Sequence, residues 1–471
     1  MVKPINQMLD SIQNKNVNQD GFLTLEIIFC IALISLFIFG VFALVFNNQY
    51  MAEDGENSAY ALRLAHAGME GALAAGFSFT APADVTDGGF IEHLQTDWLA
   101  DYAKKITSRV SFVSSGRPLA IELNSLVTDW QNNLGKDTCA LEFLGDWKNP
   151  VLRGAVSTGA NNPATDIDAL GGKVYVATNG STQSLDDFFV VDAMDLDHPS
   201  IIKSINTGPG LNAVQVAGDY AYAANSSING QLQIIKISNP ANPTVMLNVK
   251  FLDAASGGIG SSIFYTRGKV YIGTPKNNGP EFYIYDVSNP LTPHFLGEFE
   301  IGSGVNKIYV YGNYAYVATG DVNRFRILDI SNPVNIKEVG DFSDVGGTAQ
   351  SGESVAMLGG QAVLGRAGGL PGDHIPELYL LDVNNPQNIQ NLYSSDINMS
   401  VNDIFLRGGL AFLATNKTGG EFQIYNLANN QLAYFSSATL PTTAVALDCE
   451  GENFFIALSG DPALQIISPK Y

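Results

Sequence analysis

The sequence predicts an N-terminal α+β part, made of a long α-helix with a small β-hairpin head, followed by an all-β seven-bladed propeller. Three observations predict this order. An apolar run near the N-terminus continues into an amphipathic helical pattern, two segments of alternating polarity follow it, and a strand-rich unit then recurs seven times. The chain of 471 residues is long enough for several domains with apolar cores.

The apolar run covers residues 22–46 and contains one charged residue, Glu26. At about 1.5 Å per residue, a helix of this length crosses a bilayer. A secretory signal peptide would place its cut site after the apolar core. Here the polar segment before the core ends in Gly21, and a cut at that point would keep the helix and free the amine of Phe22.

Glu26 requires a partner, because a carboxylate in hydrocarbon costs several kcal/mol unless it is paired. The new α-amine of Phe22 on a neighbouring helix would supply one. The stretch Gly-Phe-Leu-Thr-Leu-Glu at residues 21–26 resembles the processing site of type IV prepilins and the related pseudopilins. The resemblance covers the leader and the helix that follows it. A plain membrane anchor whose Glu26 snorkels to the membrane surface is the alternative interpretation.

The resemblance implies that a membrane-embedded prepilin peptidase cuts after Gly21 and methylates the amine of Phe22. It also implies that Glu26 aligns the subunit with other pilins in a filament. Residues 1–21 are then a prepilin leader, and residues 22–75 are a stem helix whose part 22–46 is transmembrane.

The sequence departs from the pilin pattern at Ala43, where many pilins have a helix-kinking proline. Apolar positions at helical spacing continue past residue 46, and Gly76 and Pro82 end the pattern.

Two alternating segments, 104–115 and 117–127, flank the pair Ser115-Gly116 and predict the β-hairpin. Val110, Phe112, Ile121 and Leu123 are expected on one side of it. A hairpin packed on the second half of a long helix is what a small pilin head looks like. Residues 76–148 are therefore expected to hold a small pilin-like β region and a connector.

A glycine-led turn followed by a strand then repeats at intervals of 43 to 50 residues. The first glycines of the copies are Gly171, Gly218, Gly268, Gly312, Gly359, Gly408 and Gly451. A second apolar strand follows each copy, and several of these end in Asn-Pro turns. Seven strand-rich copies of this length are typical of a β-propeller, here assigned to residues 149–471.

The amino-acid sequence of the copies resembles that of the LVIVD-repeat family of bacterial surface propellers, as in NYAYVATGDVNRFRILDISNP at residues 313–333. The resemblance is specific for the fold and says little about activity. The seventh copy lacks a fourth strand, and Val151–Thr158 is expected to supply it, because propellers avoid open edges by closure. Cys139 in the connector and Cys449 near the last glycine turn are expected on the same face. They form either a disulfide or two unrelated thiols, with Cys30 reduced in the membrane helix.

The loops between second and third strands and between fourth and first strands vary in length and share one face, where recognition is expected. The sequence contains few patterns that are typical of catalytic sites. His66, His93, His198, His294 and His374 are scattered, and His374 with Asp373 and Glu377 makes at most a weak metal site. The pairs Asp186/Asp187 and Asp195/Asp197 do not follow an EF-hand spacing. No catalytic residue, metal or cofactor is assigned, and an enzyme is not expected.

The formal charge is −21, and the sequence contains no stripe of basic residues that could bind phosphates. A nucleic-acid partner of the propeller is therefore not expected. The favoured role is a minor type IV pilin that displays the propeller for adhesion to a surface, glycan or protein. It would reside in the bacterial inner membrane before assembly, and on the pilus or cell surface afterwards. The alternatives are a pseudopilin of a type II-like secretion or DNA-uptake machine, and a membrane-tethered propeller hydrolase.

Overall fold

The computed structural model describes residues 51–76, 79–100, 103–128, 138–180, 184–251, 258–322, 324–343, 350–368 and 374–471. These residues form two compact units. The first unit holds the described residues up to Gln95 together with Ile106–Ser125. The second holds Thr96–Lys105 and Leu126–Tyr471. The predicted boundary at residue 149 therefore lies inside the second unit, which also includes upstream residues.

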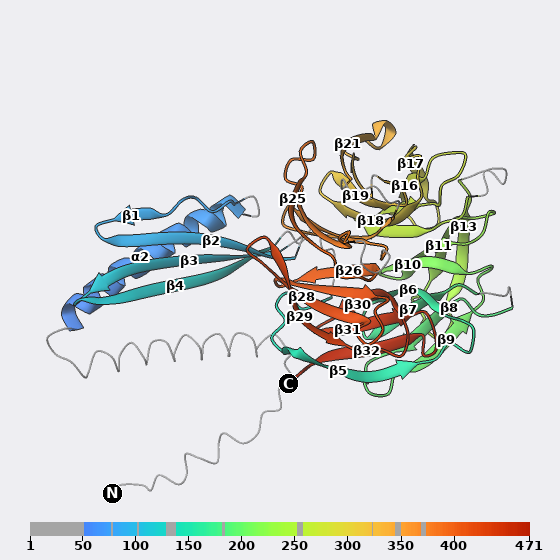
Figure 1. Cartoon of the computed structure of the whole chain (residues 1–471), viewed down its shortest axis with the longest axis horizontal. Helices are drawn as coiled ribbons and strands as arrows, with labels where there is room; N and C mark the ends of the chain where they lie inside the picture. The colour runs from blue at the N-terminus through green and yellow to red at the C-terminus, as the bar shows by residue number, and fades with distance from the viewer. Residues whose placement is uncertain are drawn as a thin grey trace, which may run out of the picture. The chain divides into compact units, whose positions relative to one another are not determined.

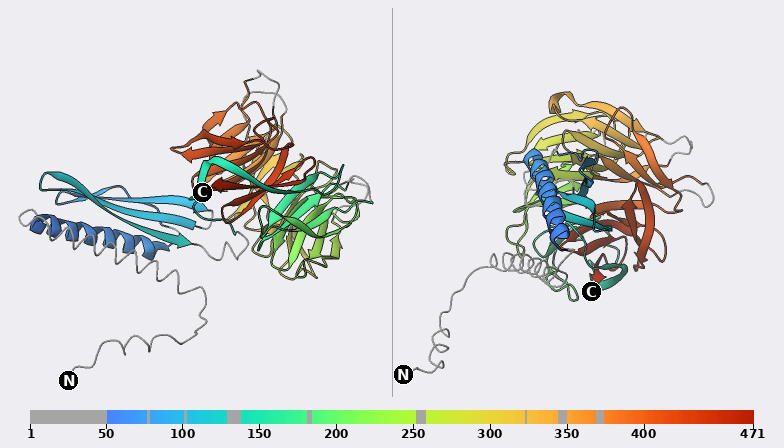
Figure 2. Two further views of the ribbon diagram at one scale, coloured as in Figure 1. Left: turned by 90° about the horizontal axis from the view of Figure 1, so that it is seen from below. Right: turned by 90° about the vertical axis from the view of Figure 1, so that its left-hand side faces the viewer.

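The first unit packs one helix on an antiparallel sheet. The helix α2 (Met51–Ala75) ends where the sequence predicts, and Gly76 follows it at φ +64°. The sheet has the order β1 (Val85–Asp87), β2 (Phe90–Ala100), β3 (Ala103–Ser114) and β4 (Arg117–Thr128). The predicted hairpin is therefore two strands of a four-stranded sheet, and Figure 2 shows α2 along one face of it.

Small residues on α2 allow the close approach of helix and sheet. Ala61 and Ala65 are fully buried against Val110 and Phe112 of β3, with Ile121 partly buried beside them. The expected inward side of the hairpin is thus confirmed. At the start of α2, the carboxylate of Asp54 accepts a hydrogen bond from Ser114 at 2.5 Å and pairs with Arg117 at 2.5 Å, which ties the helix to the β3–β4 turn.

The second unit contains seven four-stranded sheets that follow one another around a ring, as Figure 1 shows, so the propeller prediction is confirmed. The innermost strands are β6 (Ala164–Ala169), β10 (Leu211–Ala217), β14 (Ser262–Thr266), β18 (Val305–Tyr311), β22 (Gly352–Leu358), β26 (Val401–Arg407) and β30 (Ala444–Glu450). The second strands are β7 (Lys173–Thr178), β11 (Tyr220–Asn225), β15 (Lys269–Gly273), β19 (Tyr314–Thr319), β23 (Gln361–Arg366), β27 (Leu410–Thr415) and β31 (Asn453–Leu458).

The third strands are β8 (Phe188–Asp192), β12 (Leu232–Lys236), β16 (Phe282–Asp286), β20 (Phe325–Asp329), β24 (Leu378–Asp382), β28 (Phe422–Ala428) and β32 (Leu464–Lys470). The outermost strands are β9 (Ser200–Ile205), β13 (Thr244–Val249), β17 (His294–Phe299), β21 (Lys337–Phe342), β25 (Gln390–Ser395), β29 (Gln431–Ala438) and β5 (Asp146–Val156), and a 3-10 turn, η4 (Pro333–Asn335), precedes β21. Second and third strands are almost entirely buried because each blade packs between two neighbours.

Several innermost strands carry a polar side chain that donates a hydrogen bond to the backbone of the next blade. Asn306 donates to the carbonyl of Gly352 in the next blade at 2.8 Å, and Asn402 donates to that of Ala444 at 2.7 Å. Thr165 does the same to Leu211. These contacts join the innermost strands of consecutive blades.

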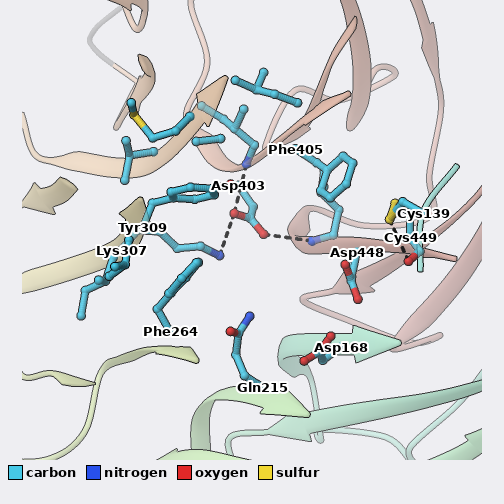
Figure 3. Close-up of a pocket in the computed structure, with 18 of the residues that line it drawn as sticks. Cys139, Asp168, Gln215, Phe264, Lys307, Tyr309, Asp403, Phe405, Asp448 and Cys449 are labelled. Atoms are coloured by element: carbon cyan, nitrogen blue, oxygen red, sulfur yellow. Dashed lines mark hydrogen bonds and ion pairs between the residues drawn. A yellow bond between two sulfur atoms is a disulfide. The ribbon is translucent and has the colours of Figure 1, made fainter. Parts of the chain in front are cut away.

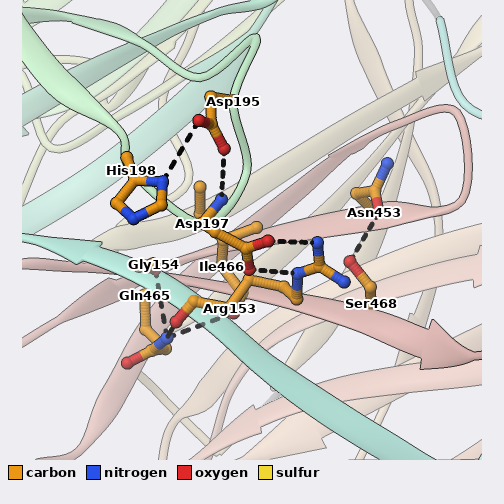
Figure 4. A network of polar contacts seen from close by, with 9 residues as sticks. All are labelled: Arg153, Gly154, Asp195, Asp197, His198, Asn453, Gln465, Ile466 and Ser468. Carbon is orange, nitrogen blue, oxygen red and sulfur yellow. Dashed lines mark hydrogen bonds and ion pairs between the residues drawn. The ribbon is translucent and has the colours of Figure 1, made fainter.

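The ring is closed by β5, which pairs with β32 and completes blade seven. The closing strand runs from Asp146 to Val156 rather than from Val151 to Thr158, because Trp147 is buried between blades six and seven and holds the earlier residues against β32. The guanidinium of Arg153 contacts the carboxylate of Asp197 in the β8–β9 turn at 2.7 Å, as Figure 4 shows. The closing strand is thus bound to both of its neighbouring blades.

Within the ranges that the structure describes, no helix combines the length and the apolar character that a membrane crossing requires. The one described α-helix is α2, which corresponds to the last part of the predicted stem helix. The predicted leader, residues 1–21, and the predicted transmembrane segment, residues 22–46, lie outside the described residues.

Candidate binding site

Charged side chains from the innermost strands gather near the axis of the propeller. Alternate residues of a strand point to the same side, so β6 presents Asp166 and Asp168 together. Lys307 in β18 and Asp403 in β26 occupy the strand position that corresponds to Asp166. Asp448 in β30 occupies the position that corresponds to Asp168. The ring brings together residues that are up to 282 positions apart in the chain (448 − 166).

Lys307 reaches across the axis from blade four to Asp403 in blade six, with 2.7 Å between Nζ and Oδ1. The lysine side chain is 31% exposed, and the carboxylate is 5% exposed. Burial by itself lowers the pKa of Lys307, but the attraction of Asp403 and Asp166 outweighs burial, so the pKa is raised. The other oxygen of Asp403 accepts the backbone N–H of Leu447 at 3.1 Å.

Asp166 is partly buried and accepts the backbone N–H of Val214 at 2.8 Å. Desolvation raises the pKa of Asp166 to about 7, with Lys307 opposing the rise and Asp403 adding to it. A carboxyl with this pKa is about half protonated at neutral pH. The charge of the channel therefore changes in the physiological range of pH.

Asp448 and Asp168 belong to the adjacent blades seven and one (Figure 3). Asp448 accepts the backbone N–H of Ala169 at 2.7 Å, and Asp168 accepts that of Val216 at 2.5 Å. Desolvation raises the pKa of Asp448 well above its ordinary value, and the neighbouring carboxyl of Asp168 raises it further. Asp448 therefore retains a proton at a pH where an exposed aspartate is ionised.

Four of these charged residues line a cavity of about 190 Å³, namely Asp168, Lys307, Asp403 and Asp448. Its wall also contains the aromatic side chains of Phe264, Tyr309 and Phe405, which Figure 3 shows facing the same space as the carboxyls. The guanidinium of Arg407 lies 5.2 Å from the ring centroid of Phe405. The cavity thus combines carboxyl groups, two cations and aromatic surface.

The connector borders this cavity through Thr138 and Cys139. The backbone of the connector pairs with the glycine turn of blade seven, since Ala140 donates to Gly451 at 2.7 Å and Gly451 donates to Thr138 at 2.9 Å. Cys139 and Cys449 are joined by a disulfide with their Cα atoms 5.4 Å apart. The connector therefore arrives on the glycine-turn face, as the sequence predicts.

The opposite face carries the variable loops in which recognition is predicted. Residues 181–183, 252–257, 344–349 and 369–373 of these loops lie outside the described residues. Where the loops meet the blades, buried carboxylates hold their backbone. Glu281 accepts the N–H groups of Ile301 and Gly302, both at 2.9 Å, and Glu377 accepts that of Ile397 at 2.9 Å.

The residues of the predicted processing site, Gly21, Phe22 and Glu26, lie outside the described residues, and so does Cys30.

The histidines and paired aspartates of the sequence analysis have separate partners. His198 lies 3.1 Å from Asp195, and His374 lies 3.7 Å from Asp396. Asp187 accepts the N–H of Thr207 at 2.7 Å. Asp373 lies outside the described residues. In the part of the chain that the structure describes, no three His, Cys, Asp or Glu side chains are grouped so that they could hold a metal ion.

Sequence reasoning missed the charged residues of the channel. The signal was a charged residue at the same place in otherwise apolar strands, two positions after the first residue of β6, β18 and β26, which places Asp166, Lys307 and Asp403 in one layer. The same count from the end of β30 finds Asp448 two positions before the strand ends.

Two segments of the propeller, residues 212–250 and 303–344, match the LVIVD repeat. The second segment includes residues 313–333, on which the resemblance was based. No curated protein matches the chain.

Solved structures show the same fold at low sequence identity. A chain of the mitotic checkpoint complex aligns with a TM-score of 0.51 at 14% identity, over 70% of this chain and 94% of that chain. A protein from Lactobacillus plantarum aligns with a TM-score of 0.51 at 13% identity, over 62% of this chain and 89% of that chain. The WD40 propeller domain of Doa1 gives a TM-score of 0.49 at 15% identity, over 68% of this chain and 97% of that domain. At these identities the likeness concerns the fold alone.

Proposed function

We propose that this chain is a filament-associated, type IV pilin-like subunit that displays its propeller as an extracytoplasmic binding module. The observation that carries the proposal is the sequence Gly-Phe-Leu-Thr-Leu-Glu at residues 21–26, placed at the start of an apolar run that continues to residue 46. The motif is supported by its context, because a cut after Gly21 leaves a membrane helix with a carboxylate four residues from its new N-terminus.

The first structural unit supports the same proposal. The predicted stem continues into α2, whose alanines pack closely on an antiparallel sheet. A helix that lies on a small sheet through its second half is the arrangement that the resemblance to pilins implies.

The second unit supports the binding part of the proposal. A propeller can mediate binding, and this one offers a channel lined with charged and aromatic groups. The buried carboxylates Glu281 and Glu377 also fix the ends of the loops on one face of the ring. Rigid blades that carry shaped loops are a common basis of recognition.

The proposal is tested by two substitutions in the full chain, expressed in a bacterium that has a prepilin peptidase and pili. Gly21→Val should leave the leader attached, because the peptidase cannot accept the bulky residue, and the protein should be missing from sheared filaments. Glu26→Ala should be cleaved normally but assembled poorly, since only the pairing in the membrane is lost. Thr24→Ala is the matched control in the same run. Surface levels of the Glu26→Ala protein equal to those of the unaltered protein would indicate a plain anchor.

A further inference from the structure

One layer of the channel divides into an acidic half and an aromatic half. The layer is formed by the residues that stand at the same register position in the seven innermost strands. In the order of the blades these are Asp168, Gln215, Phe264, Tyr309, Ala356, Phe405 and Asp448. Blades seven, one and two thus supply the polar half, and blades three, four and six supply aromatic rings.

This division matches the chemistry of an organic ammonium group. Aromatic faces attract cations through their quadrupole, and carboxylates pair with ammonium groups through charge-assisted hydrogen bonds. The lining already uses this chemistry, since the guanidinium of Arg407 lies over the ring of Phe405.

The charge of the layer and its surroundings also favours a cation. The cavity is lined by three carboxyl groups, those of Asp168, Asp403 and Asp448, and by the two cations Lys307 and Arg407. The carboxyl of Asp166 lies close enough to Lys307 to influence its titration. A further cation beside these carboxyls would lower the pKa of Asp448, which would then ionise and pair with the cation.

A metal ion suits this cavity poorly. Among the residues that the structure describes, no three potential ligands are grouped as a metal ion requires, and aromatic rings offer no oxygen or nitrogen ligand. The volume of about 190 Å³ is below the roughly 300 Å³ at which pockets for drug-sized ligands begin. It suits a group of the size of one side chain.

We propose that the channel binds a primary alkylammonium group, with its nitrogen at Asp448 and Asp168 and its alkyl stem against Phe264 and Tyr309. The group would belong either to a free alkylamine or to a lysine side chain of a protein partner. This inference rests on the proposed role of the propeller as a binding module, and it does not depend on leader cleavage or on filament assembly.

The test measures binding of n-butylammonium to the full-length protein in detergent by titration calorimetry at pH 7. Saturable binding is expected, and the neutral isostere n-pentanol should not bind. Asp448→Asn keeps an acceptor for the N–H of Ala169 but removes the carboxyl that can ionise beside a bound ammonium group, and it should weaken binding about tenfold. Tyr309→Leu removes an aromatic face and should weaken binding independently, which keeps the test decisive if the first variant does not fold.

The matched control is Asp195→Asn, which makes the same change of charge in an exposed turn outside the channel and should bind normally. A second arm uses the peptide acetyl-Gly-Lys-Gly-amide. Binding of this peptide at the same site indicates a protein lysine as the source, and binding of the free amine alone indicates a small molecule. Absence of saturable butylammonium binding, equal binding of pentanol, or unchanged binding by both channel variants would overturn the inference. Normal cleavage and assembly with no amine binding would refute this inference alone.

Discussion

The ammonium nitrogen of Lys307 lies 2.7 Å from a carboxylate oxygen of Asp403, although the two residues belong to blades that are not neighbours. The carboxyl of Asp166 in blade one influences the same lysine electrostatically. Lys307 therefore joins blades four and six by an ion pair, and its charge offsets part of the negative charge of the carboxyl groups at the centre of the ring.

Replacing this lysine should destabilise the propeller. Lys307→Met leaves the buried carboxylate of Asp403 without its cation, and we expect a loss of about 2 kcal/mol in the free energy of unfolding. This is less than the roughly 3 to 5 kcal/mol of a fully buried pair because Lys307 is 31% exposed. The double variant Lys307→Met/Asp403→Asn should recover at least half of the loss.

Urea unfolding followed by tryptophan fluorescence measures these differences. The exposed Lys236 provides the control, and Lys236→Met should change the free energy of unfolding only slightly. If Lys307→Met and Lys307→Met/Asp403→Asn unfold at the same urea concentration, the ion pair does not contribute to the free energy of unfolding as expected.

Asp166 should make the propeller less stable as the pH rises. The folded state holds a proton with a pKa of about 7, against an ordinary value of 3.8, so between these values the folded state binds more protons than the unfolded state. Its contribution is present below about pH 4 and is lost as the pH rises through about 7. The loss is on the order of 4 kcal/mol.

Comparing the urea midpoints of the protein and of Asp166→Asn from pH 4 to pH 8 isolates this effect. The variant should show a smaller decline, since other carboxyls with a raised pKa such as Asp448 still titrate, whereas Asp195→Asn, in an exposed turn, should keep the full decline. Parallel curves for the protein and the Asp166 variant would show that this carboxyl titrates normally in the fold.

Trp147 should account for much of the stability of the ring closure. It is 2% exposed, and its ring centroid lies 5.2 Å from that of Phe412 and 5.5 Å from that of Phe454. Trp147→Ala should cost about 3 to 5 kcal/mol by leaving a cavity between blades six and seven. Phe295→Ala, at a residue that is 51% exposed, is the control and should cost less than about 1 kcal/mol.

The disulfide between Cys139 and Cys449 should be present in protein exported from the cytoplasm. Peptide mapping without reductant should recover the two cysteines in one linked pair. The double variant Cys139→Ser/Cys449→Ser should lose about 2 to 5 kcal/mol, because the bond joins residues that are 310 positions apart. Recovery of both cysteines as alkylated free thiols from the exported protein would contradict the connection.

The propeller could be predicted from the sequence because the turns and strands that form each blade are local and recur in every copy. The glycine turns require positive φ, as at Gly312 and Gly451, and they mark every blade. The absence of a fourth strand in the last copy was enough to predict closure by an upstream strand. The bounds of β5 were missed by five residues at its start because only the three-dimensional packing of Trp147 extends it.

Two other features could not be predicted for physical reasons. The strand β2 has inward positions that include Glu92, which accepts a hydrogen bond from Ser108, so its apolar residues do not alternate regularly. The channel cluster is hard to recognise in the linear chain, since Asp166, Lys307 and Asp403 lie in strands of three different blades. They meet only when the ring has closed.

The mass of the N-terminal peptide tests the central proposal most directly. The full chain is isolated from sheared filaments and from membranes of the same cells, and its N-terminal peptide is sequenced by mass spectrometry. The account predicts that the filament form begins with N-methylated Phe22 and lacks residues 1–21. A filament or surface form that retains Met1 to Gly21, or that begins with an unmethylated residue after the apolar run, would contradict it.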